Sequence, residues 1–204
     1  MKRFIIRFAK TVSRLFFPLY LPMLGLVILF FMSYLSLLSW QYKLQVLITV
    51  FFFTIMLPSY MISWYRRYRG WSHKQMSKKE NRIMPYIIVL ICYVSCYILM
   101  NVMRIPRYMG NILLVSLVIQ MTCAIVNIFW KISTHCAGVG AVVGALIAFS
   151  IIFDFNPVGW LCLAIIVSGI VGSSRMILRQ HTLSQVLAGF TVGLLISCNM
   201  LLFV

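Results

Sequence analysis

Acidic residues are nearly missing from this chain of 204 residues, which carries eighteen lysines and arginines but only two acids, Glu80 and Asp154. Magnesium and calcium bind through several carboxylate oxygens, and zinc needs three or four converging His, Cys or carboxylate ligands. We therefore expect neither a metal site nor any other cofactor. Histidine is left for acid–base or nucleophilic chemistry, and the many cations are left to hold an anion.

Paired cysteine spacings of the metal-binding kind are missing as well. The six cysteines all lie within or beside apolar runs, at positions 92, 96, 123, 136, 162 and 198. A thiol in such a place behaves as a small apolar group. We interpret these residues as packing groups between helices.

Long polar segments are scarce, because 63% of the residues are hydrophobic and only 10% are charged. This composition excludes a water-soluble domain and predicts an integral membrane protein. Arg7 and Lys10 interrupt the first apolar residues and no small-residue cleavage site follows, so we expect no removable signal peptide. The one long polar segment, 66–82, is too short for a domain, and we expect a single membrane domain, 1–204.

Seven apolar runs are long enough, at roughly 20 residues each, to cross a bilayer as helices. They cover about 15–39, 43–64, 84–103, 109–130, 135–153, 157–174 and 182–203. Pro18 and Pro22 interrupt the first run and the sixth is short. The predicted fold is therefore all-α, a polytopic transmembrane helix bundle with six to seven spans. Glycines and alanines in 137–145, together with Gly189 and Gly193, are interpreted as surfaces for close helix packing.

Positive charge collects on one side of such a bundle. If all seven runs cross, parity places the N-terminus, the 66–82 segment, and the turns at 131–134 and 175–181 on one face. That face carries fifteen of the eighteen lysines and arginines, and the other carries Lys43, Arg104 and Arg107. The positive-inside rule then predicts that the crowded face is cytoplasmic, even when three candidate phosphate ligands are left out of the count.

An arginine and a histidine stand between two apolar runs in the segment 174–185, which makes it the candidate active site. Ionisable groups at such a depth are costly and are usually functional. Arg175 closes one run and His181 opens the next. Gln185 lies one helical turn after His181 on the same face, where its side-chain oxygen could orient the imidazole.

A second histidine belongs to the same face by parity. His135 opens another run directly after Ser133 and Thr134, which are favourable N-cap residues, so backbone N–H groups and the helix dipole would face an anion. The cations of 78–82 approach from the polar segment. The candidate phosphate-binding residues are Arg175, Arg82, Lys79 and Ser133.

Two histidines with two or more cations in one layer are typical of a metal-free phosphoryl-transfer site. One imidazole attacks phosphorus, the other protonates the leaving oxygen, and the cations offset charge on the equatorial oxygens. Gln185 favours His181 as the nucleophile, which leaves His135 as the acid. Because a single interfacial histidine is more often a satisfied polar group than a catalyst, the argument depends on both. Arg179 is interpreted as a charge that sets topology.

The spacing resembles that of the type-2 phosphatidic acid phosphatase superfamily. The segment SRMILRQHTLSQ at 174–185 follows the spacing of the family's third motif, SRxxxxxHxxxD. ISTH at 132–135 looks like its second motif, PSGH, and KENRIMP at 79–85 loosely echoes its first, KxxxxxxRP. The resemblance covers about 79–195 as a phosphatase-like core, and the wider pattern is similar to a small bacterial inner-membrane branch.

By that resemblance, His181 would attack phosphate and His135 would be the general acid. The phosphate ligands would be Arg175, Arg82 and Lys79. The resemblance implies a metal-independent hydrolase of a lipid-linked phosphate monoester or pyrophosphate, with a phosphohistidine intermediate. The expected partners are the bilayer and a membrane lipid phosphate, without nucleic acid, and the oligomeric state stays open.

The family's orienting Asp is Gln185 in this chain. An amide oxygen can accept an imidazole N–H, but it cannot stabilise an imidazolium by charge. This keeps open a second hypothesis, a catalytically impaired relative that binds anionic lipid headgroups. A small transporter is a third, less favoured because transporters usually place polar groups near the midplane, whereas here they collect at one face.

Overall fold

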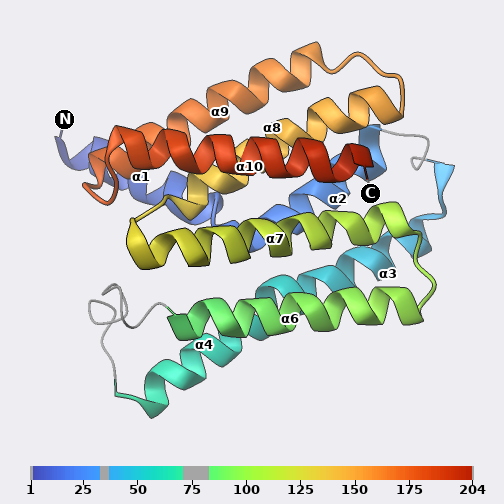
Figure 1. Ribbon diagram of the computed structural model, residues 1–204, viewed down its shortest axis with the longest axis horizontal. Helices are drawn as coiled ribbons and strands as arrows, with labels where there is room; N and C mark the ends of the chain where they lie inside the picture. The colour runs from blue at the N-terminus through green and yellow to red at the C-terminus, as the bar shows by residue number, and fades with distance from the viewer. Residues whose placement is uncertain (1, 33–36, 71–82, 204) are drawn as a thin grey trace.

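The computed structural model describes residues 2–32, 37–70 and 83–203, which form an all-α bundle (Figure 1). No strand occurs in these ranges. Six helices are long and apolar enough to cross a membrane, or seven if a bent N-terminal pair counts as one span. The predicted helical bundle with six to seven spans is confirmed, and the protein is a membrane protein.

The spans are mostly single long helices. The first of the six is α3 (Trp40–Phe51), continued by the π-helical turn η3 (Phe52–Met56) and by α4 (Leu57–Tyr68). The others are α6 (Ile83–Val102), α7 (Arg107–Phe129), α8 (Thr134–Ile152), α9 (Val158–Ile177) and α10 (Leu183–Phe203). The π turn directly precedes Pro58, whose missing N–H interrupts the regular α-helical ladder.

The N-terminal region differs from the single run predicted at 15–39. It consists of α1 (Lys2–Leu15), the short 3-10 helix η1 (Pro18–Tyr20) and α2 (Leu21–Met32). The helices on either side of Leu21 are bent by 81°. Proline supplies no N–H to the preceding turn, so the prolines at 18 and 22 separate helices that apolarity alone would join. Helix α1 was not predicted.

The closest helix pair is α8 with α10. A Cβ added to Gly140 or Gly144 would overlap a carbonyl oxygen of α10, and one added to Gly189 or Gly193 would overlap a carbonyl oxygen at Ser133 or Ala137. The predicted small-residue packing is confirmed, since no other residue type lets the backbones approach so closely. The two helices begin at the same end of the bundle, which brings His135 and the residues before α10 together (Figure 1).

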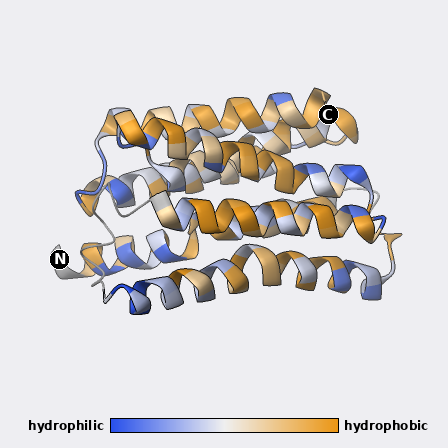
Figure 2. Cartoon of the chain, turned by 60° about the horizontal axis from the view of Figure 1, so that its bottom comes forward, coloured by the Kyte–Doolittle hydropathy of each residue, from blue (hydrophilic) through white to orange (hydrophobic). Residues whose placement is uncertain are grey.

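The main core lies among α2, α3, α6, α7, α8 and the far end of α10. Cys96 and Cys123 are buried in it beside Met109 and Leu113, as expected of packing thiols. The outer faces of the helices are also apolar, with polar residues gathered toward the helix ends (Figure 2). This distribution fits a bundle whose sides contact lipid and whose ends meet water.

Candidate functional site

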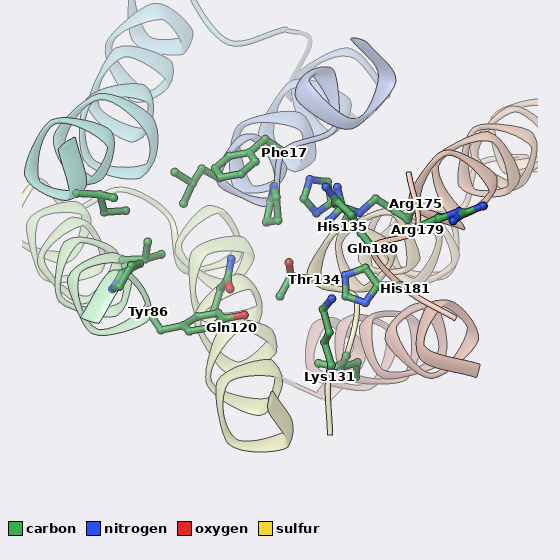
Figure 3. A pocket seen from close by; sticks show the side chains of 16 residues that line it. Phe17, Tyr86, Gln120, Lys131, Thr134, His135, Arg175, Arg179, Gln180 and His181 are labelled. Atoms are coloured by element: carbon green, nitrogen blue, oxygen red, sulfur yellow. The ribbon is translucent and has the colours of Figure 1, made fainter. Parts of the chain in front are cut away.

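A pocket of about 530 Å³ opens at the end of the bundle where α8 and α10 begin and α9 ends. The polar residues that line it are Gln120, Lys131, Thr134, His135, Arg175, Arg179, Gln180 and His181, and all but Gln120 form what we call its polar wall. Its apolar wall consists of Phe17, Pro18, Leu19, Ile62, Pro85, Tyr86, Val89 and Ile132. In Figure 3, Tyr86 and Gln120 lie across the cavity from His135, Arg175 and His181. Every charged side chain that the described part of the chain contributes to the pocket is basic, so these residues favour the binding of an anion.

His181 lies two residues before α10 and its side chain is half-buried. Its Nδ1 is 3.2 Å from the Gln185 side-chain oxygen, and the Thr182 backbone N–H donates to the same oxygen at 3.2 Å. Because a backbone N–H only donates, the atom facing it must be the amide oxygen, and Nδ1 must then carry the hydrogen. In the neutral imidazole Nε2 holds the lone pair that a nucleophile needs.

Gln185 therefore has two roles. Its bond to the Thr182 N–H is one half of a capping box, in which the third helical residue satisfies the N-cap N–H and starts α10. Its bond to His181 is the predicted orienting contact, which the structure contains. The residue does not line the pocket itself and acts on it through the imidazole.

His135 is the second residue of α8 and is 8% exposed. Its Nε2 donates to the backbone carbonyl oxygen of Ser13 at 3.1 Å, which fixes the hydrogen on Nε2 because a carbonyl only accepts. The ring edge of Phe17 packs against it, with ring centroids 5.7 Å apart and planes at 77°. This imidazole thus has the opposite tautomer to His181.

Arg175 lies in the last turn of α9 and extends toward His135 (Figure 3). Its Nη1 donates to the Ser13 hydroxyl. The preceding Ser174 is buried, and its hydroxyl donates to the Ile170 carbonyl oxygen within the same helix at 2.7 Å. Of these two residues, only Arg175 lines the pocket. Arg175 and both histidines line one pocket, as the spacing predicted.

Ser133, a predicted phosphate ligand, is fully buried and does not line the pocket. Its hydroxyl caps α8 by accepting from the Cys136 N–H at 3.4 Å. Its backbone N–H donates to the Gln185 carbonyl at 3.3 Å, which ties the starts of α8 and α10 together. Thr134 presents its side chain to the pocket instead. The other two predicted ligands, Lys79 and Arg82, lie outside the described residues.

Comparisons with protein-family models, with curated proteins and with solved structures all ended without a match. The chemistry of the pocket is therefore argued from its own residues.

Sequence reasoning did not assign Lys131, Arg179 or Ser13 to the site, nor the uncharged polar lining residues Gln120, Thr134 and Gln180. Lys131 lies four residues before His135, and Arg179 one helical turn after Arg175, a spacing that could have suggested a shared face. Arg179 has a left-handed backbone with φ 52° at the end of α9, which leaves it exposed at the rim of the pocket. Ser13 gave no local signal, because its contacts come from helices far along the chain.

Taken together, the polar wall offers one imidazole with a lone pair on Nε2, one with a hydrogen on Nε2, and three cations. Such a set can hold a tetrahedral oxyanion, attack it from one side and protonate it from another. Among the described residues, no three His, Cys, Asp or Glu side chains are grouped as metal ligands.

Proposed function

We propose that this protein is a metal-independent membrane phosphatase that removes phosphate from a lipid-linked phosphate monoester or pyrophosphate. The observation that carries the proposal is the pair of opposite histidine tautomers, at His181 and His135, in one basic pocket. The Nδ1–H tautomer gives His181 a lone pair on Nε2 for attack on phosphorus. The Nε2–H of His135 is the hydrogen that this residue, once protonated on both nitrogens, can pass to the leaving oxygen.

In the first step, the lone pair on His181 Nε2 forms a bond to phosphorus while the bond from phosphorus to the lipid oxygen breaks. With the anionic phosphate bound, His135 acts as an imidazolium with hydrogens on both ring nitrogens. It gives its Nε2 hydrogen to that leaving oxygen and becomes neutral, exchanging its bond with the Ser13 carbonyl for this transfer. Arg175 and Lys131 offset the charge on the equatorial oxygens. In the second step, the now neutral His135 Nε2 takes a proton from water, whose oxygen bonds to phosphorus while the bond from phosphorus to His181 Nε2 breaks. Phosphate is released, His181 regains its lone pair, and His135 is again an imidazolium.

The two walls of the pocket support an amphiphilic substrate. The polar wall suits a phosphate headgroup, and the apolar wall, with Leu19, Ile62 and Val89, suits the first carbons of a lipid. The resemblance of 132–135 and 174–185 to the type-2 phosphatidic acid phosphatase superfamily agrees with this substrate class. We place the site on the cytoplasmic side of a bacterial inner membrane, because fifteen of the eighteen lysines and arginines belong to that face.

The test is a phosphate-release screen with purified protein in detergent. The substrates are phosphatidate, phosphatidylglycerol phosphate, prenyl pyrophosphate and lipid A, each with and without EDTA. We expect hydrolysis of at least one substrate that resists EDTA, is inhibited by vanadate, and falls by about 10⁴ or more in His181→Ala. His73→Ala is the control, since the proposal does not use that histidine. Absence of turnover on all four, or equal turnover in His181→Ala, contradicts the proposal.

Gln185 favours a second candidate function, a relative that binds anionic headgroups without hydrolysis, because the amide adds no charge to support an imidazolium. In that case headgroup binding would survive His181→Ala and His135→Ala but fall in Arg175→Ala, with no turnover in the unmodified protein. Vesicle binding with the same lipids separates the two functions.

A further inference from the structure

One residue outside the polar wall contacts two of its members. Ser13, near the end of α1, accepts a hydrogen bond from His135 Nε2 through its backbone carbonyl and one from Arg175 Nη1 through its hydroxyl. The partners are 122 and 162 residues away along the chain. These bonds make α1 part of the site.

The docking of α1 fixes where Ser13 lies. Ala9 and Val12 are buried, and Phe16 packs with them on the same helical face as Ser13, with spacings of three and four residues. Val12 packs against Val139 of α8 and Val171 of α9, the helices that carry His135 and Arg175. The opposite face, with Lys10 and Arg14, is exposed. The serine is therefore held between the two helices whose side chains it contacts.

The position of Ser13 in its helix explains why it can accept both bonds. Its carbonyl is one of the last four of α1, which have no partner within the helix and need a donor from elsewhere. The C-terminal end of a helix also carries partial negative charge, which favours a guanidinium beside it. A guanidinium is a rigid fork of five donors, so a bond at Nη1 sets the plane in which the others point.

We propose that Ser13 is a positioning residue, whose hydroxyl and carbonyl hold Arg175 and His135 in the orientation in which the pocket binds a phosphate group. The choice of phosphate as the ligand rests on the proposed function. The positioning role itself concerns binding and geometry and does not require turnover. The opposite role, in which α1 blocks the pocket, predicts that losing the Ser13 bond increases phosphate binding.

The experiment compares full-length Ser13→Ala and Ser13→Thr in detergent, by titration with inorganic phosphate. Ser13→Ala should bind phosphate about tenfold more weakly, because a hydrogen bond to a charged group is lost, and Ser13→Thr should restore binding because it keeps the hydroxyl. Thr11→Ala is the matched control. Thr11 is exposed on the same helix, and its hydroxyl bonds only the Arg7 carbonyl, at 3.2 Å, as far as the described structure shows.

A second readout needs no ligand. Nitrogen-15 NMR of the unmodified protein should show the His135 hydrogen on Nε2. It should also show separate guanidinium N–H signals for Arg175, which merge into an averaged signal in Ser13→Ala but stay separate in Ser13→Thr. Unchanged Arg175 signals with unchanged phosphate affinity in Ser13→Ala overturn the proposal, as does tighter binding or an unmodified protein that binds no phosphate. Phosphate binding that depends on Ser13 without lipid hydrolysis would uphold the positioning role and reject the phosphatase.

Discussion

Gln185 shows how one side chain can serve helix formation and chemistry together. Its oxygen accepts both the Thr182 N–H that starts α10 and the His181 N–H that fixes the tautomer. Replacing it with an apolar residue would therefore disturb the helix and the imidazole at once. A substitution that adds a negative charge at this position but keeps both hydrogen bonds is the more informative experiment.

We expect Gln185→Glu to increase the rate of phosphate release by about tenfold to a hundredfold. The carboxylate keeps the length and both acceptor bonds and adds the charge that stabilises the imidazolium, a contribution worth about 10⁴ in the serine-protease comparison. Initial rates on the preferred lipid phosphate give the measurement. Gln180→Glu adds the same charge at the exposed edge of the pocket without touching His181 in any described contact, and it should slow the reaction by repelling phosphate.

The contact between His181 and Gln185 could be predicted from the sequence because it spans one helical turn, whose geometry is fixed by the helix itself. The sequence predicts Ser133 both as an N-cap residue and as a phosphate ligand. The structure confirms the cap, whereas the buried hydroxyl does not line the pocket. Ser13 could not be predicted, since its partners come from helices that join it only in the folded bundle.

At the scale of elements, the pair α8 and α10 sets the distance between the two histidines. The sequence signalled this pair clearly, because glycines at helical spacing have few uses in a membrane other than close packing. The sequence did not predict α1, because arginines and lysines interrupt its apolar residues and its buried face is narrow. Apolarity also placed η1 and α2 within the single predicted run 15–39, although the prolines at 18 and 22 interrupt it.

We expect Gly193→Ala to destabilise the protein by about 1–3 kcal/mol, because the new methyl group overlaps the Ala137 carbonyl and forces the two helices apart. The matched control is Gly169→Ala in α9, where an added Cβ meets nothing within 4 Å. This control should be neutral or stabilise by up to about 1 kcal/mol, since alanine favours the helix more than glycine. Thermal unfolding in detergent, followed by circular dichroism, measures both, and equal stabilisation would refute the packing role.

For the whole molecule, the bundle has a basic end with the pocket and an opposite end with few charges. Hydropathy predicted the number of membrane spans, six to seven, and parity predicted that both histidines lie at the same end of the bundle. The arrangement of helices about the pocket did not, because lipid-facing and protein-facing sides of a transmembrane helix are both apolar and hydropathy cannot separate them.

We expect the pocket end to be cytoplasmic. Two exposed residues suit single cysteine replacements: Tyr68, at the pocket end of α4, and Met103, just beyond the opposite end of α6. Both replacements are made in a chain in which the exposed Cys162 is changed to serine. A membrane-impermeant maleimide added to intact bacterial spheroplasts should label Met103→Cys, and should label Tyr68→Cys only after permeabilisation. The reverse pattern would place the site on the outer side.

The contacts of Ser13 also have a consequence for biosynthesis. Helix α1 is translated before Arg175, which its serine contacts and which lies 162 residues further along the chain. Until α8 and α9 have inserted, the nascent protein has one half of this contact and no pocket. Activity toward the surrounding lipids would then begin only when the bundle is nearly finished, so an incompletely translated chain could not attack the membrane that it is entering.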